Sequence, residues 1–411
     1  MTQHVHIGLI FDYDTGYCRG VLRGIKQYAE AMRHWVLIPV VADPRAVRAL
    51  GKLNVDGLIS WLFRRSVAAV ARSLEKPWVS VCGVLSDDLI PRVGPDDFLM
   101  GQLAALHLLG CGIRRFAFIG HTYHAGADRR EAGFRQTIER AGYSLDYYHE
   151  HGPRLFKSTT QGWAPNRSFR RWVLSLPTQV GVAAFYDFLG LQLSEACREA
   201  GLRVPEDVAI VGMGNDDLLC EFARPSLSSV AVANELIGYR AAALLDHLMK
   251  GHAPPPGPIL VPPPGVVARQ SSDVLAIGDD DVAAALRWIR AASHRPIRVD
   301  DLLRDIPVSR RLLERKFRRI LGRGISEEIR RVHVERAKSL LAGTDLAMSA
   351  LAVSAGFSNA SHLSIVFRQA TAQTPTAYRS QFRGRTHALI VGSDRDAIPE
   401  QSRSSPEQAD L

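Results

Sequence analysis

Hydrophobic and polar positions follow two different patterns along the chain. Residues 5–275 alternate short apolar runs, which predict buried strands, with amphipathic stretches, which predict helices; 6–11 and 20–31 are the first of each kind. A second series of the same type begins at the predicted strand 115–120. Strands that alternate with helices are typical of an α/β domain with parallel sheets, so two such series predict two lobes with a cleft between them.

After about residue 282 the apolar positions recur only at helical spacing, and one pattern occurs twice. Each copy contains a short helix, a turn and a longer helix, predicted at 299–303, 306–308 and 309–320, and again at 349–353, 356–357 and 359–369. Leu313 and Phe317 of the first copy correspond to Leu363 and Phe367 of the second, at a shift of 50 residues. With a predicted joining helix at 326–342, this internal repeat has the form of two helix–turn–helix units.

The excess positive charge of the chain lies on this repeat. The net charge is +9, and residues 286–385 hold 20 Lys or Arg against 8 Asp or Glu. Residues 1–285 hold 29 of each. A single basic helix is most often only a solvated surface. A duplicated helix–turn–helix that concentrates such charge indicates binding to the phosphates of double-stranded DNA.

Three separated motifs make the repeat similar to a known family. Arg336-Ala-Lys-Ser-Leu-Leu341, Ala355-Gly-Phe-Ser358 and Thr374-Pro-Thr-Ala-Tyr-Arg379 resemble, in order and spacing, the AraC-type DNA-binding domain. The resemblance implies a bi-lobed, all-helical domain that places one recognition helix from each half in the major groove. The outward faces of these helices supply the predicted DNA-binding residues: Arg310, Arg311, Glu314, Arg315 and Arg318, then Asn359, Ala360, Ser361, Ser364, Ile365 and Arg368. Ile365 stands where the family often has Arg, which would replace a polar base contact by an apolar contact with a thymine methyl group.

The cleft in the first part of the chain is the predicted ligand site, because ligands bind such sheets beyond the carboxyl ends of the strands. The loops at those ends carry polar and aromatic side chains together, a combination that suits the hydroxyl groups and ring faces of a sugar. Ordinary loop capping explains any one of these side chains equally well. The predicted effector-binding residues are Asp12, Tyr13, Tyr17, Tyr123, Arg130, Tyr186, Asp187, Asn215 and Asp216.

This region also resembles a known family. Tyr17-Cys-Arg-Gly-Val-Leu-Arg-Gly-Ile25, Arg130-Glu-Ala-Gly-Phe134 and Gly201-Leu-Arg-Val-Pro-Glu-Asp-Val208 are similar to the effector domain of LacI/GalR-type regulators, a periplasmic-binding-protein fold. The resemblance implies that Arg130 holds sugar hydroxyls and that Asp187 belongs to the ligand loop of the second lobe. Gly214 stands where that family commonly has a sugar-binding Asp.

Together the two resemblances predict a two-lobed, periplasmic-binding-protein-like α/β domain followed by an all-α double helix–turn–helix domain. We expect the effector-binding domain over 1–275, the AraC-type DNA-binding domain over 282–385, and a disordered tail over 386–411. The implied function is sequence-specific transcription regulation, with activation of sugar-metabolism genes under the control of a monosaccharide such as xylose. The expected partners are double-stranded DNA, the effector, a second copy in a homodimer, and RNA polymerase.

The sequence lacks the patterns of an enzyme or a metalloprotein. It has no GxGxxG, Walker loop or nucleophile elbow, and its five cysteines form no CxxC pair, so we expect no catalytic residues, no metal and no cofactor. No apolar run is long enough for a membrane span, and the first residues do not have the parts of a signal peptide, which favours a reduced, cytoplasmic protein. Two alternatives remain: a non-sugar effector or a purely dimerising first domain, motivated by Gly214, and, less favoured, an enzyme that acts on a sugar.

Overall fold

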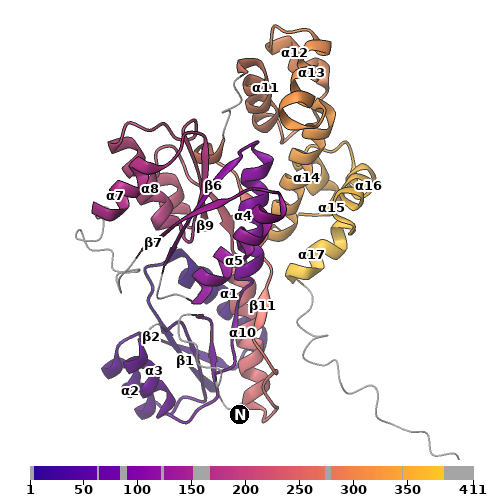
Figure 1. Cartoon of the computed structure of the whole chain (residues 1–411). Coiled ribbons are helices and arrows are strands. Elements are labelled where there is room, and N and C mark those ends of the chain that lie inside the picture. The colour runs from indigo at the N-terminus through magenta and orange to yellow at the C-terminus, as the bar shows by residue number, and fades with distance from the viewer. Residues whose placement is uncertain are drawn as a thin grey trace, which may run out of the picture.

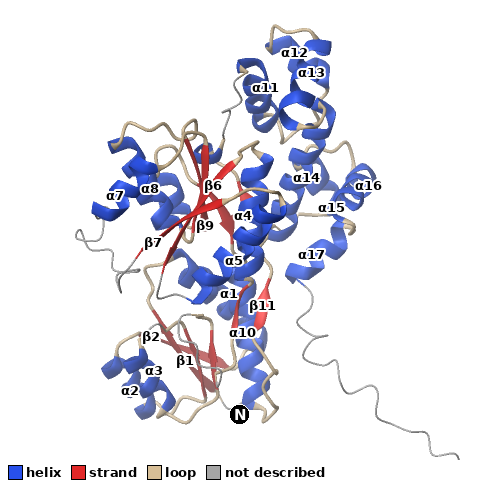
Figure 2. Ribbon diagram, in the orientation of Figure 1, coloured by secondary structure: helices blue, strands red, loops and turns tan. Residues whose placement is uncertain are grey.

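The computed structural model describes residues 4–62, 64–83, 90–121, 125–150, 167–273, 279–344 and 346–383. An α/β part with two lobes is followed by a helical part, which lies against the second lobe (Figure 1). Figure 2 shows the strands gathered in the two lobes, while the described residues from 279 onward form helices and their connections. No helix in the described ranges has both the length and the apolar character that a membrane span requires.

The first lobe is built on a four-stranded parallel sheet with the strand order β2-β1-β3-β4. Its strands are β1 (Val5–Phe11), β2 (Trp35–Val41), β3 (Gly57–Ser60) and β4 (Trp78–Ser80). Its helices are α1 (Gly16–Met32), α2 (Pro44–Lys52), α3 (Arg65–Arg72) and α10 (Asn234–Met249). Alternate residues of β1 enter different cores: Ile7 and Leu9 pack with α1 and α10, whereas Ile10 packs with α2 and α3. Helices therefore cover both faces of the sheet, as the apolar strands predicted.

The second lobe contains a six-stranded sheet with the order β12-β10-β9-β8-β6-β7. Its strands are β6 (Arg115–His121), β7 (Leu145–Glu150), β8 (Val180–Ala184), β9 (Val208–Gly214), β10 (Ser228–Ala231) and β12 (Gly265–Val267). Its helices are α4 (Asp97–Gly110), α5 (Ala125–Arg140), α7 (Arg167–Ser175), α8 (Asp187–Glu199) and α9 (Asp217–Phe222). The edge strand β12 runs antiparallel to β10, so this strand departs from the parallel arrangement that the sequence predicted for the sheets.

Within the described residues the chain passes between the lobes at three crossovers, which together are called the hinge here. Strands β5 (Val93–Pro95) and β11 (Ile259–Val261) pair with each other and contribute Val93 and Val261 to the first lobe's core. From there one crossover leads through Asp96 into α4, and another leads through 262–264 into β12. The remaining crossover, 232–233, connects β10 with α10. Residues 262–264 are all proline, which makes that crossover a stiff segment.

A pair of helices in each lobe packs so closely that only glycine fits at the contact. Four Cβ atoms added to these glycines would fall 1.8–2.0 Å from a carbonyl oxygen of the facing helix: Gly24 against Glu235, Gly238 against Val21, Gly101 against Arg130, and Gly133 against Phe98. Real Cβ contacts essentially never fall below 3.0 Å. The pairs α1–α10 and α4–α5 therefore each behave as one unit with a fixed register.

The helical part consists of two small cores joined by one long helix. Its helices are α11 (Asp280–Ala291), α12 (Val299–Asp305), α13 (Arg310–Leu321), α14 (Ile325–Gly343), α15 (Met348–Ser354), α16 (Ala360–Thr371) and α17 (Pro375–Arg383). Leu313 and Phe317 lie in the first core, and Leu363 and Phe367 in the second. The predicted repeat and its joining helix are confirmed, with helix ends within one or two residues of those expected.

Candidate effector pocket and DNA-binding surface

A cavity of about 390 Å³ lies between the two lobes. Its walls come from the ends of strands and the starts of helices on both sides, which is where the sequence placed the ligand site. Five of the nine predicted effector residues line it: Tyr17 from the first lobe, and Arg130, Tyr186, Asp187 and Asp216 from the second. A volume of this size falls in the range of small-molecule sites.

Arg130 is the fixed cation of the pocket. Its Nε donates to Asp97 Oδ1 at 2.8 Å, and its Nη1 donates to the Phe185 carbonyl at 2.7 Å. The guanidinium carbon lies 5.2 Å from the centre of the Phe185 ring. The residue is 8% exposed, so this cation is stabilised by its acid partner and by the ring face. Two of the five guanidinium N–H groups are used within the described part of the chain, which leaves a donor edge for a ligand.

Asp187 is the buried acid of the pocket and is 3% exposed. Its Oδ1 accepts a hydrogen bond from the Ser229 hydroxyl at 2.5 Å, and its Oδ2 accepts one from the Asp216 N–H at 2.8 Å. Burial raises the pKa of Asp187 to about 6, and the two hydrogen bonds oppose that rise. At neutral pH the carboxylate is therefore ionised and can accept hydrogen bonds from ligand hydroxyl groups.

Asp216 joins the two lobes at the edge of the cavity. Its Oδ2 accepts a hydrogen bond from the Gly16 N–H at the start of α1, at 2.9 Å, and its Oδ1 caps α9 through the Leu219 N–H. The two contacts bring the N-termini of α1 and α9 to one carboxylate. A carboxylate suits this place because both helix ends carry partial positive charge.

Of the other four predicted effector residues, three are described by the structure and do not line the cavity. Tyr13 donates to the carbonyls of Leu9 and Val40 at 3.2 and 3.4 Å, and Asn215 accepts from Arg269 at 2.9 Å. Asp12 has its pKa raised, by partial burial first and by Asp14 second. Tyr123 lies outside the described residues. Their contact with an effector stays a prediction.

Sequence reasoning missed several cavity residues. Trp61 follows β3 directly, so the rule that selected the other strand ends would also have found it. Asp97 follows a crossover rather than a strand of either main sheet, and no local signal marked it. Two exposed residues of α9 that form the rim of the cavity, Leu218 and Phe222, were missed as well. They are 53% and 67% exposed, and in the sequence they resemble ordinary surface residues.

The backbone at Gly214 disfavours a second acid beside Asp187. Its φ is +132°, a conformation that L side chains rarely adopt, and an added Cβ would lie 3.0 Å from Asp187 Oδ2. A carboxylate at this position would therefore be strained and would lie against Asp187. The backbone at Gly214 fits glycine and not the acid that related effector domains commonly carry there.

Helix α13 presents the predicted base-contacting residues of the first half-domain. The Ser309 hydroxyl caps the helix through the Leu312 N–H, and Arg311 and Arg315 are exposed. The side chain of Glu314 is only one-third exposed, and its Oε2 accepts the Ile325 N–H at 3.2 Å. Arg310 and Arg318, which are 63% and 72% exposed, lie 3.4 and 3.6 Å from Asp300 and Glu314. The structure thus leaves the arginines available to DNA and gives Glu314 a structural contact; the base contacts themselves stay predictions.

Helix α16 presents the second predicted surface. Asn359 Oδ1 caps the helix by accepting the His362 N–H at 2.8 Å, as its position in the sequence suggested. Ser361 and Arg368 are exposed, and Ile365 is 60% exposed. Ala360 and Ser364 are half-buried. These side chains are accessible on the outer face of α16, and their contacts with bases stay predictions.

Two family models match the chain. A periplasmic binding protein-like domain matches residues 105–272, and a helix-turn-helix domain matches residues 302–381. A two-lobed ligand-binding fold followed by a duplicated helix–turn–helix places the chain in the class of DNA-binding transcription regulators.

Full-length relatives narrow this class. The chain is 30% identical over 388 residues to the xylose operon regulatory protein of Escherichia coli K12, which covers 92% of the chain and 97% of that relative. It is 29% identical to the protein of the same name from Haemophilus influenzae. The solved structure of the xylose-binding transcription activator xylR has a TM-score of 0.57 and 27% identity, over 92% of this chain and 98% of that one. The chain belongs to the family of xylose operon regulatory proteins.

Proposed function

We propose that this regulator activates transcription in response to a monosaccharide bound between the lobes, with D-xylose as the first candidate. The observation that carries the proposal is Arg130, a buried cation held by Asp97 with its remaining donors available in the cavity. Such a group donates to sugar hydroxyls, while the nearby carboxylate of Asp187 accepts from them. Sequence relatives whose names refer to xylose support the same ligand class.

The cavity also offers an apolar wall for the sugar ring. Tyr17 and Trp61 lie with their ring centres 6.3 Å apart on the first lobe, and Phe185 lies on the second. A ligand that contacts both walls binds best when the lobes are together. By mass action it then shifts the protein toward that state.

On the DNA side we propose that α13 and α16 enter successive major grooves, with Arg311 and Arg315 as the main base contacts of the first half. We further propose a homodimer that acts in the cytoplasm and contacts RNA polymerase. The functional division is an effector domain over 1–275 and a DNA-binding domain over 282–385. The tail over 386–411 lies outside the described residues.

The test is the thermal unfolding of the full chain with D-xylose and with a panel of pentoses, hexoses and their phosphates. A ligand at 100 times its Kd adds about 2.7 kcal/mol to the free energy of unfolding, which raises Tm by roughly 5–11 °C at 2–4 °C per kcal/mol. R130K should lose most of this rise, whereas the matched control R135K, at an exposed position of the same helix, should keep it. If none of the sugars raises Tm, the effector is not a sugar or the first domain only dimerises.

A further inference from the structure

Helix α4 has one end in the effector pocket and the other at the DNA-binding domain. Asp97, its first residue, lines the cavity. The carbonyl of Gly110, its last residue, accepts a hydrogen bond from Arg323 Nη2 at 3.0 Å. At 1.5 Å per residue its 14 residues span about 21 Å. We propose that α4 transmits the state of the pocket to the DNA-binding domain and that Arg323 is the positioning residue that makes this domain follow α4.

At the pocket end, α4 is bound rigidly to the residue expected to hold the ligand. Asp97 pairs with Arg130 of α5. Four residues further along, Gly101 lies directly against the Arg130 backbone, where an added Cβ would be 1.9 Å from the carbonyl oxygen. Arg130 is thus held to α4 by its side chain and by its main chain. A displacement of Arg130 on ligand binding therefore displaces α4 with it.

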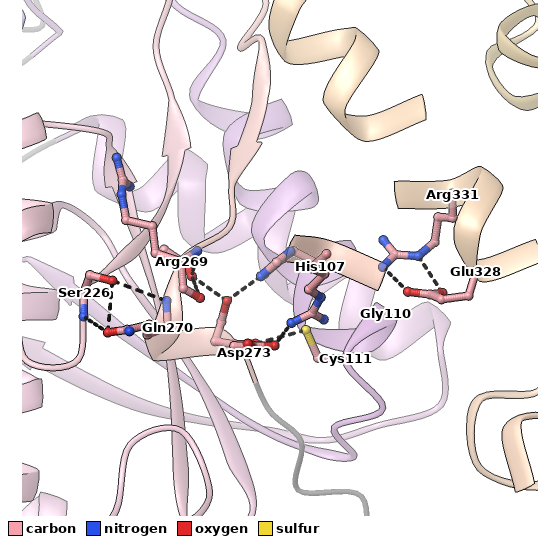
Figure 3. Close-up of polar contacts among 12 residues, drawn as sticks. His107, Gly110, Cys111, Ser226, Arg269, Gln270, Asp273, Glu328 and Arg331 are labelled. Carbon is pink, nitrogen blue, oxygen red and sulfur yellow. Dashed lines mark hydrogen bonds and ion pairs between the residues drawn. The ribbon is translucent and has the colours of Figure 1, made fainter. Parts of the chain in front are cut away.

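At the opposite end, a buried charge cluster joins α4 to α14. Glu328 is completely buried; it accepts from Arg323 Nε at 2.5 Å and from Arg331 Nη2 at 2.7 Å. Burial alone would raise the pKa of Glu328, but hydrogen bonds and charge from the two arginines lower it below its usual value. A buried carboxylate needs such partners, and Arg323 adds a bond to the negative end of the α4 dipole. Figure 3 shows Gly110 of α4 beside the Glu328–Arg331 pair.

The last turn of α4 also holds the segment that leads into the DNA-binding domain. His107 Nε2 lies 2.6 Å from the Ser272 hydroxyl, and the Cys111 thiol, just after the helix, donates to the Ser272 carbonyl at 3.3 Å. The next residue, Asp273, forms an ion pair with Arg290 of α11. In Figure 3 His107 and Cys111 lie between Asp273 and the α14 pair. The end of α4 therefore contacts the DNA-binding domain directly, and it also binds Ser272, whose neighbour Asp273 pairs with that domain.

A separate contact connects the second half-domain with the hinge. The Tyr378 hydroxyl of α17 donates to the Pro264 carbonyl at 3.1 Å. Pro264 ends the stiff proline crossover between β11 and β12, and it has no N–H of its own. Both half-domains are thus attached to elements that would be displaced by a movement of the lobes. The first half-domain contacts the end of α4, and the second contacts a crossover between the lobes.

The test measures how strongly the full-length protein binds a DNA duplex that the wild type selects from a random pool, with and without saturating D-xylose. Allosteric coupling typically changes affinity by roughly 5- to 150-fold. The quantity compared is the ratio of the DNA affinities with and without D-xylose. In R323M this ratio should lie within twofold of one, while the affinity of the protein for D-xylose stays within twofold of the wild type. The matched control is R330M, the same change at an exposed arginine of α14, which should keep the wild-type ratio. If R323M keeps the wild-type ratio of DNA affinities, the proposal is refuted.

Two further measurements keep the outcome clear. R323M leaves Glu328 with one partner, so R323M/E328Q, in which that buried charge is removed, should show the same loss of coupling in a folded protein. The identity of the ligand rests on the proposed function, and D-xylose could fail to bind the wild type. In that case the coupling is measured by hydrogen exchange without any sugar. Binding of the DNA duplex should slow amide exchange at residues 98–102 of α4 in the wild type and in R330M, but not in R323M. Equal slowing in R323M would refute the role of α4.

Discussion

The close contact between α4 and α5 should make G101A destabilising despite its small size. The added methyl would start 1.9 Å from the Arg130 carbonyl oxygen and 2.8 Å from the Phe134 nitrogen. To reach even 3.0 Å from that oxygen, the helices must separate locally by more than 1 Å. Both atoms belong to helix backbone and cannot rotate away, so the strain spreads along the helix pair.

The expected cost is that of overpacking a well-filled core, about 1–3 kcal/mol. For a domain of this size the loss should lower Tm by roughly 2–12 °C. Because Arg130 is on the displaced backbone, G101A should also weaken binding of D-xylose. The measurements are urea unfolding of the full chain and calorimetric titration with the sugar.

The control is G110A in the same helix, where an added Cβ meets nothing within 4 Å. Replacing this helical glycine should leave stability unchanged or raise it by about 0.5–1 kcal/mol. The reasoning fails if G101A and G110A unfold at the same urea concentration with the same sugar affinity. It also fails if G101A loses sugar binding with no change in stability, because the predicted strain would then be absent.

Three further predictions concern the pocket and the DNA-binding helices. Asp187 has a pKa raised from 3.8 to about 6, so the native state loses stability as pH rises from about 4 to about 6, by roughly 3 kcal/mol. D187N, whose amide can still bond Ser229 and the Asp216 N–H, should lack this slope in urea unfolding; an unchanged slope would exclude Asp187 as its source. G214D should lose about 1–3 kcal/mol at its unfavourable φ and gain no sugar affinity, and a stable, tighter-binding variant in thermal melts would contradict this. R315A should lower operator affinity by roughly 5- to 150-fold, the equivalent of about 1–3 kcal/mol, and relax base preference at one position, as measured by gel shift with a set of duplex variants. Wild-type affinity and preference would remove Arg315 from the base contacts.

The elements of this fold were predictable because their signals are local. The spacing of Leu313 and Phe317 fixed the buried face of one recognition helix, and Ser309 and Asn359 marked where the two helices begin. Strands such as β1 and β6 were predictable from apolar runs bounded by polar turns, whereas β7 and β10 were not predicted. The antiparallel direction of β12 was not, because it depends on how the chain returns through the hinge.

The site was predictable only at the level of which loops meet. Asp187 and Arg130 fall in the cavity as expected, whereas Asn215 bonds Arg269, which lies 54 residues further along the chain. Side chains in loops have no period that fixes their direction. The role of α4 was likewise hidden, since its contact with Arg323 spans 213 positions. No residue pattern near Gly110 predicts its contact with Arg323.

The glycine contacts within the two helix pairs also indicate how this protein could be re-engineered as a biosensor. A library that varies the residues between the paired helices would mostly yield misfolded chains, because at four glycine positions the helices touch through their main chains alone. The cavity rim on α9 is different, because Leu218 and Phe222 are largely solvent-exposed and line the same cavity. Randomising these rim positions could change which inducer is recognised while the scaffold and the DNA output stay intact. Selection for a new inducer would therefore search few positions at little cost in stability.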